Sequence, residues 1–143
     1  IPALALSQRV RTGYPEDWDQ TTRMAATILA VLIEPHPPLP ADLDGQLRDR
    51  VARAIQTAPP IAPDTKSFWN VNLPCPSYGT ETPEARYVPT SADPAHFDYA
   101  HLRDKDGADR LEHRSLYFDR AVTPDTDVEA GMAGAISLSR LTV

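Results

Sequence analysis

Proline residues divide this chain into short segments and set where its helices and strands end. The sequence contains 15 prolines in 143 residues, about twice the usual share. Proline fixes φ and has no backbone N–H, so it stops a helix or a central strand. Pro35, the pair Pro59–Pro60, and Pro74 each follow a segment with a regular apolar pattern. We therefore predict two helices and a strand that end at these three places.

The segments before these prolines predict an early strand followed by two amphipathic helices. Residues 3–7 are a short apolar run, which favours a buried strand of a parallel sheet. Two later segments place apolar residues at helical spacing, and Asp42 is suited to cap the second. The expected apolar stripes are Trp18, Ala25, Ile28, Leu29 and Leu32 in the first helix, and Leu43, Leu47, Val51, Ala54 and Ile55 in the second.

A second strand is predicted at residues 68–74. Apolar Trp69, Val71 and Leu73 alternate there with polar Asn70 and Asn72. Successive side chains of a strand point to opposite faces, so this strand has one apolar face and one polar face.

The next stretch of the chain has a weaker pattern. Residues 75–110 are rich in Pro, Asp, Ser and Gly, which is typical of a long irregular connection with at most short strands, such as Arg86 to Val88. Leu111 to Arg120 predicts a strand. Long connections of this kind are often functional or form interfaces.

Two further elements are expected near the end of the sequence. Thr126 and Glu129 have the spacing of a capping box, which predicts the start of a short helix. Gly131 and Gly134 should end it. Residues 135–141 predict a final strand with Ile136 and Leu138 facing the core.

Composition excludes several classes of protein. The length fits one domain, and the net charge of −6 leaves no broad cationic surface for a nucleic-acid duplex. The longest apolar run, Met24 to Ile33, is about half of what a membrane-spanning helix needs. A single cysteine, Cys75, fits a reducing compartment. We expect a cytoplasmic protein that binds neither nucleic-acid duplexes nor membranes.

Motifs for metal or nucleophilic chemistry are weak. His96, His101 and His113 lie among aspartates, but their spacing does not suit one helix face, so solvated loop residues are the favoured interpretation. The segment Asp104–Gly107 imitates part of a calcium loop, yet the first and last ligand positions lack carboxylates, so a surface turn is favoured. Cys75 has no predicted activating base beside it.

The ends of the two early strands are the stronger candidates for a binding site. Ligands of open α/β sheets bind at the carboxyl ends of parallel strands. If residues 3–7 and 69–73 are parallel strands, Ser7 and Asn72 lie on the same rim and are predicted to bind substrate. The alternative is that both side chains only satisfy nearby loop backbone.

The order of several short motifs resembles the C-terminal half of the SurE survival nucleotidases. Residues 1–7 resemble a family strand of the form Gly-Ile-Pro-Ala-Ile-Ala-x-Ser, and residues 70–74 resemble Leu-Asn-Val-Asn-Val-Pro. Thr126–Val128 and Gly134–Leu141 resemble the Gly-Thr-Asp motif and the closing Gly-x-Ile-Ser-x-Thr-x-Leu strand.

This resemblance implies an α/β, Rossmann-like three-layer sheet and a metal-dependent phosphomonoesterase, a 5′/3′-nucleotidase that hydrolyses nucleoside monophosphates. A divalent ion, Mg²⁺ or Mn²⁺, would polarise the phosphate and lower the pKa of an attacking water. The family's metal ligands precede the part matched here. The resemblance therefore implies no catalytic or metal residue in this chain, and an enzyme that requires residues upstream of Ile1.

The resemblance also implies a division of the chain and a mode of assembly. Residues 1–143 would be the C-terminal part of a single SurE-like domain. Residues 1–75 would belong to the core, and residues 76–143 would form a β-hairpin and a C-terminal tail. The hairpin and tail would join subunits into a homodimer or homotetramer.

Two alternatives remain at this point. A chain with this fold and no metal ligands would serve as a non-catalytic oligomerisation or binding module. An unrelated enzyme that uses Cys75 or the histidines is the weaker alternative.

Overall fold

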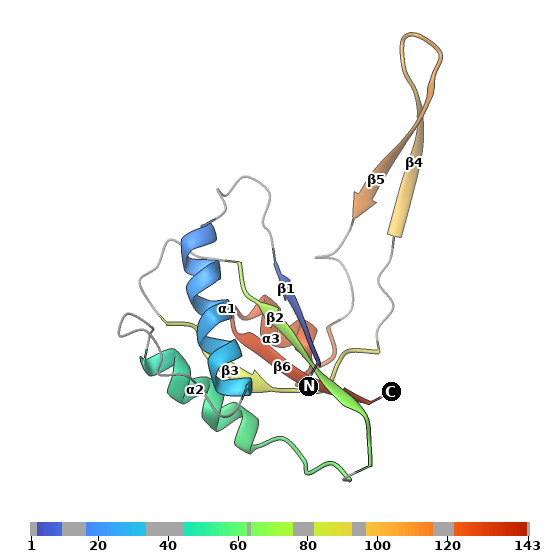
Figure 1. Ribbon diagram of the computed structural model, residues 1–143. Helices are drawn as coiled ribbons and strands as arrows, with labels where there is room; N and C mark the ends of the chain where they lie inside the picture. Colours follow the sequence, from blue (N-terminus) through green and yellow to red (C-terminus); the bar gives the residue numbers. More distant parts are fainter. Residues whose placement is uncertain are drawn as a thin grey trace.

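The computed structural model describes residues 3–9, 17–33, 45–62, 64–75, 82–92, 97–115 and 122–142. Within these ranges the chain forms both helices and strands (Figure 1). They are β1 (Ala3–Gln8), α1 (Trp18–Leu32), α2 (Gly45–Gln56), β2 (Ser67–Leu73), β3 (Ala85–Tyr87), β4 (Phe97–Arg103), β5 (Asp109–Ser115), α3 (Asp127–Met132) and β6 (Ile136–Thr142).

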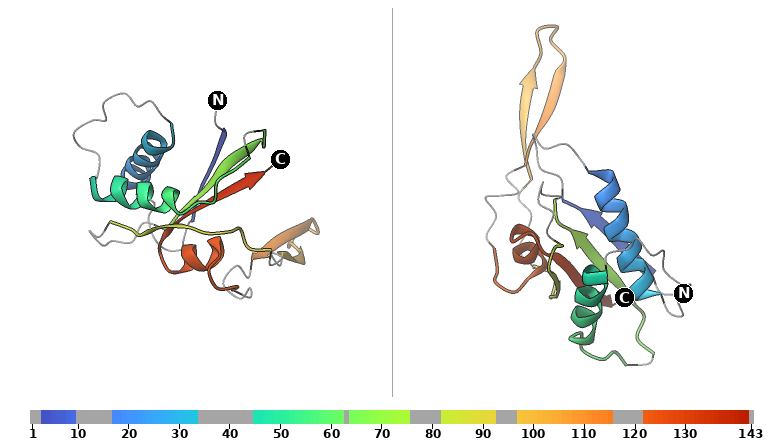
Figure 2. Two further views of the ribbon diagram at one scale, coloured as in Figure 1. Left: turned by 90° about the horizontal axis from the view of Figure 1, so that it is seen from below. Right: turned by 90° about the vertical axis from the view of Figure 1, so that its left-hand side faces the viewer.

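The main sheet is mixed rather than wholly parallel. Its strand order is β1-β2-β6-β3. β1 and β2 are parallel, as predicted, and β3 is parallel to β6, but β6 runs antiparallel to β2. Helices α1 and α2 cover one face, and α3 covers the other (Figure 2). The chain is therefore a mixed α/β protein with helices on both faces of a four-stranded sheet.

The main core lies between this sheet and the helices α1 and α2. Val71 and Leu138 are fully buried and pack with Ile28, Leu47 and Val51 from the two helices. The predicted apolar face of β2 is confirmed, because Trp69, Val71 and Leu73 are all buried while Asn70 and Asn72 are half-buried. At one end of the core, the Arg140 guanidinium lies 4.2 Å from the Trp69 ring centre.

The prediction that Trp18 belongs to the buried stripe of the first helix is wrong. Trp18 is 61% exposed, while the buried residues of α1 are Met24, Thr27 and Ile28. Trp18 begins the helix, where the Asp17 carboxylate accepts a hydrogen bond from the Gln20 amide at 2.9 Å. The first buried residue of the helix, Met24, comes more than one turn later. Pro35, Asp42 and Leu43 lie outside the described residues.

β1 is not the buried strand that its apolar run predicts. In the described sheet it is an edge strand, and Leu6 is 42% exposed. Its inner side pairs with β2 from Ala3↔Phe68 to Gln8↔Leu73. The apolar sequence of β1 is typical of a strand with neighbours on both sides, so its open edge is a notable feature of the fold.

The region predicted to be mostly irregular contains a long hairpin. β4 pairs with β5 in antiparallel register, and the ribbon extends away from the main sheet (Figure 1). The predicted strand at residues 111–120 starts earlier, at Asp109, and residues 116–120 lie outside the described ranges. The sequence does not predict β4, because residues 101–112 of the ribbon are exposed. Exposed residues need no alternation of apolar and polar side chains, which is the pattern that predicts a strand.

The segment Asp104–Gly107 forms the turn of this hairpin. The Asp104 carboxylate accepts hydrogen bonds from the amides of Asp106 and Ala108, both at 3.0 Å. Gly107 has a φ of +80°, a conformation that glycine adopts without steric cost. The Asp104 carboxylate therefore stabilises the turn, in agreement with the predicted surface turn.

The short helix α3 forms where predicted, but without the predicted capping box. The Thr126 hydroxyl donates to the Thr123 carbonyl at 2.7 Å instead of accepting from the helix. The Asp127 carboxylate accepts from the Ser91 amide at 2.6 Å, and the Asp127 amide donates to the Pro89 carbonyl. The start of α3 is therefore attached to the chain that follows β3. Gly134 has a φ of +80° and ends the turn after the helix.

The final strand, β6, is a central strand of the main sheet. β6 lies between β2 and β3, and residues 136–139 are all buried. β6 therefore pairs with two strands of its own chain, β2 and β3. Among the described residues, no helix is long and apolar enough to cross a membrane.

Val71 provides a test of the assigned core. Val71→Asp places a carboxylate where the side chain is fully buried among apolar neighbours. We expect it to lower the free energy of unfolding by about 3–5 kcal/mol, since the charge has no partner. Asn70→Ser, on the other face of the same strand, should cost less than about 1 kcal/mol. Chemical denaturation of both variants measures this, and equal stabilities would contradict the assignment of faces.

Candidate functional site

Ser7 and Asn72 meet at the carboxyl ends of β1 and β2, as predicted. The two residues are partners in the parallel register. The Ser7 hydroxyl donates to Oδ1 of Asn72 at 2.5 Å. The predicted alternative, in which both side chains bond only to loop backbone, does not describe this pair, because the two side chains bond to each other.

A third side chain extends this pair across the sheet. Nδ2 of Asn72 donates to the Ser137 hydroxyl at 3.0 Å, and Ser137 lies opposite Asn72 in the antiparallel register. Ser137 is fully buried, whereas Ser7 is exposed and Asn72 half-buried. The row Ser7–Asn72–Ser137 is thus anchored at its buried end and accessible at its β1 end.

The row lies on the face of the sheet that carries α3. Arg86 of β3 is the register partner of Ser137 and forms an ion pair with Glu129 of α3, at 3.5 Å. On the next row, the buried Ser139 hydroxyl donates to the Val88 carbonyl at 2.7 Å. The hydroxyl groups of Ser137 and Ser139 are buried on this face, and both have hydrogen-bond partners. Such partners offset the cost of burying polar groups.

Arg9 connects the same edge to α3. Its amide donates to the Leu73 carbonyl at 3.0 Å, which continues the pairing of β1 and β2 by one residue. Its guanidinium donates to the Gly131 carbonyl at 2.8 Å. Gly131 lies in the last turn of α3, where unsatisfied carbonyls favour a cation. Arg9 therefore fixes the position of α3 relative to the ends of β1 and β2.

The row can bind a polar ligand but does not contain a complete catalytic site. Ser7 offers a hydroxyl, and the Asn72 amide has a second N–H beyond the one that bonds Ser137. Within the described ranges, no three His, Cys, Asp or Glu side chains gather in a way that could hold a metal ion. The row as described offers hydroxyl and amide groups for hydrogen bonding.

The other candidates from the sequence do not converge on this row. His101 is exposed on the hairpin, and Cys75 is half-buried after the end of β2. His96 lies outside the described residues, as does the side chain of His113. The zinc and nucleophile hypotheses gain no support from these positions.

Sequence reasoning missed Ser137 and Arg9. Residues alternate between the two faces of the last strand, so the sequence could have predicted that Ser137 lies on the face away from Ile136 and Leu138. Its meeting with Asn72 depends on β6 lying next to β2, which no local pattern shows. Arg9 gave no signal, because its partner is a backbone carbonyl 122 residues away.

Comparison with known proteins identifies the fold. No family model matches the sequence, and no curated protein matches it. The structure is similar to the crystal structure of a SurE protein from Aquifex aeolicus, with a TM-score of 0.53 and 16% sequence identity. The chain has part of a SurE fold. The match covers 99% of this chain and 46% of that SurE chain, which confirms the partial SurE resemblance predicted from the motifs.

Proposed function

We propose that this chain belongs to a SurE-type phosphomonoesterase that hydrolyses nucleoside monophosphates in the cytoplasm, and that its Ser7–Asn72 pair binds the substrate. The observation that carries the proposal is the accessible hydrogen-bonded pair at the carboxyl ends of two parallel strands. Sheets of this type bind ligands at such ends. The SurE fold supports the reaction class.

The open edge of β1 indicates where the remainder of the site belongs. The described part of the chain spans less than half of the SurE structure that it matches. A parallel strand added to β1 would end beside Ser7 and would cover the exposed Leu6. Residues that follow such a strand would face the Ser7–Asn72 row.

The described residues do not fit a divalent-ion site by themselves. They contain no cluster of three suitable ligands, and the Oδ1 atom of Asn72 already accepts from Ser7. The proposal therefore assigns the ligands of Mg²⁺ or Mn²⁺ to other parts of the complete polypeptide. This chain binds and orients the substrate.

Each residue of the row then has a distinct task. Ser7 is exposed, and because its hydroxyl hydrogen is donated to Asn72, its oxygen accepts a hydrogen bond from a hydroxyl or N–H group of the substrate. The Asn72 amide offers its second N–H to the substrate, and the bond to buried Ser137 fixes the orientation of the amide. A rigid polar group loses little entropy when it binds, so this support strengthens each substrate hydrogen bond.

Substitution of the row tests the proposal in the complete polypeptide. With p-nitrophenyl phosphate and Mn²⁺, Ser7→Ala and Asn72→Ala should each lower kcat/KM about tenfold, which corresponds to loss of a hydrogen bond worth about 1.4 kcal/mol. Thr22→Ala, on an exposed position of α1, is the matched control. Unchanged kcat/KM in both row variants, with unchanged melting temperatures, would contradict a role in substrate binding.

A non-catalytic oligomerisation or binding module is the second candidate. It is favoured by the lack of catalytic groups in the described row, where only hydroxyl and amide side chains meet. The two candidates differ in one property of the complete polypeptide: the hydrolase turns over a phosphomonoester, and the module does not.

The hairpin β4–β5 is proposed to join subunits into a homodimer or homotetramer. Tyr99 and Leu111 are 56% and 60% exposed, and Leu102 is 39% exposed. A two-stranded ribbon is marginally stable by itself in water, because it buries little apolar surface. Contact with a second copy of the chain would cover these side chains.

Removal of the hairpin tests this assembly. Replacing residues 98–114 of the complete polypeptide by a short glycine–serine linker should give monomers that still melt cooperatively, because the ribbon is separate from the main sheet. Light scattering measures the mass. An oligomer that survives this deletion unchanged would contradict the role of the hairpin, and so would an intact protein that is monomeric.

A further inference from the structure

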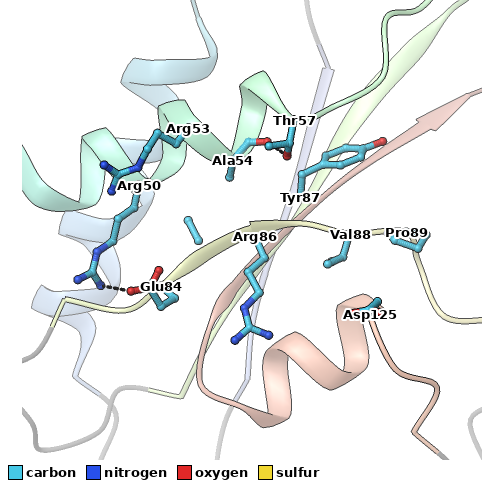
Figure 3. A pocket seen from close by; sticks show the side chains of 11 residues that line it. Arg50, Arg53, Ala54, Thr57, Glu84, Arg86, Tyr87, Val88, Pro89 and Asp125 are labelled. Atoms are coloured by element: carbon cyan, nitrogen blue, oxygen red, sulfur yellow. Dashed lines mark hydrogen bonds and ion pairs between the residues drawn. The ribbon is translucent and has the colours of Figure 1, made fainter.

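The outer edge of β3 borders an open groove of about 460 Å³ (Figure 3). The groove follows six consecutive residues, Glu84 to Pro89, and its other walls come from α2 and from Asp125. β3 is the last strand of the described sheet, so no described strand pairs with its outer side. The groove therefore lies along the edge of β3 that no described strand covers.

The backbone of β3 presents hydrogen-bonding groups to this groove. The Glu84 carbonyl accepts from the Ile136 amide at 2.7 Å, and the Val88 amide donates to the Leu138 carbonyl at 3.0 Å. Peptide groups two residues apart in a strand point in the same direction, so Arg86 also faces β6. The N–H and C=O groups of Ala85 and Tyr87 face the groove. Strand groups that no described strand pairs with are a template for an added strand.

The side chains of the groove are biased toward positive charge. Its lining contains three arginines and two acidic residues, although the whole chain has a net charge of −6. Arg50 is paired with Glu84 at 3.3 Å and also donates to the Thr82 carbonyl. Arg86 is paired with Glu129 on the α3 side.

Arg53 differs from these two arginines. It is exposed on α2 and lines the groove, and its guanidinium forms no hydrogen bond or ion pair with any residue that the structure describes. Ala85 and Tyr87 belong with the core that α2 covers, so their side chains lie on the α2 face of the sheet. A strand added to β3 would direct the side chains opposite Ala85 and Tyr87 to this same face, beside Arg53.

The edge favours a particular occupant. In an antiparallel pairing of β3 with a second copy, in which Ala85 lies opposite Tyr87, Arg86 would lie directly opposite its own copy. Like charges at that position destabilise a pair of strands. Pro83 and Pro89 flank β3, so a bound strand is limited to a short bonded stretch. We propose that the β3 edge binds a short, acidic, extended peptide segment of a partner protein by strand addition.

A designed peptide tests this inference with the complete polypeptide. The probe is fluorescein-labelled Thr-Glu-Val-Glu-Thr-amide, in which both glutamates lie opposite Ala85 and Tyr87. Fluorescence anisotropy should show saturable binding below about 1 mM, the weak range expected for so short a segment. The same peptide with N-methylated glutamates lacks the two donors that face β3 and should not bind. A peptide with lysine in place of both glutamates should bind more weakly.

Protein variants separate the backbone contribution from the charge. Ala85→Pro removes an N–H that faces the groove and leaves the bonds to β6 intact, so binding should be lost while the protein stays folded. Arg53→Gln should weaken binding of the glutamate peptide about threefold, as expected for an exposed ion pair. Arg48→Gln, on α2 but outside the groove, should have no effect.

If Ala85→Pro does not fold, the N-methylated peptide and Arg53→Gln still decide the question. The absence of saturable binding by the glutamate peptide would overturn the inference. Equal binding by the N-methylated peptide would exclude strand addition, and equal binding by Arg53→Gln and the original protein would exclude the acidic preference. None of these results bears on hydrolysis, because the β3 edge and the Ser7 edge lie at opposite ends of the sheet order.

Discussion

Burial of one face of β2 beneath α1 and α2 determines how the rest of the chain is arranged. Val71 is fully buried, with Ile28 and Val51 against it, and β2 pairs with β1 on one side and β6 on the other. A strand has a period of two, so a shift of one residue would turn Trp69, Val71 and Leu73 away from the two helices. The register that buries Val71 is the same register that directs Asn72 to the opposite face.

The candidate site follows from that register. With β1 parallel to β2, Ser7 lies beside Asn72, and with β6 antiparallel, Ser137 lies on its other side. The buried Ser137 hydroxyl needs a partner, and the Asn72 amide supplies one at 3.0 Å. The same hydrogen bond therefore gives the Ser137 hydroxyl its partner and fixes the orientation of the Asn72 amide. The proposed binding edge is therefore built from hydrogen bonds between residues of this chain.

The sequence predicted the parts of the fold that depend on local periodicity. α1, α2 and β2 stand where apolar spacing and prolines indicated, and Ser7 and Asn72 meet as expected from parallel strands. β4 was not predictable because a ribbon exposed on both faces has no burial pattern. The place of β6 between β2 and β3 depends on contacts between segments far apart in the chain. Thr126 has the residue type of a cap, but its hydroxyl donates to the Thr123 carbonyl and accepts no hydrogen bond from the helix.

The central proposal is that this chain supplies the substrate-orienting edge of a phosphomonoesterase whose metal ligands lie in other parts of the complete polypeptide. The most direct measurement is the hydrolysis of p-nitrophenyl phosphate with Mn²⁺ or Mg²⁺ by the complete polypeptide and by residues 1–143 alone. The account predicts turnover by the complete polypeptide that chelation abolishes, and no turnover above the buffer rate by residues 1–143. Turnover by residues 1–143 at a rate near that of the complete polypeptide would contradict it, as would an inactive complete polypeptide.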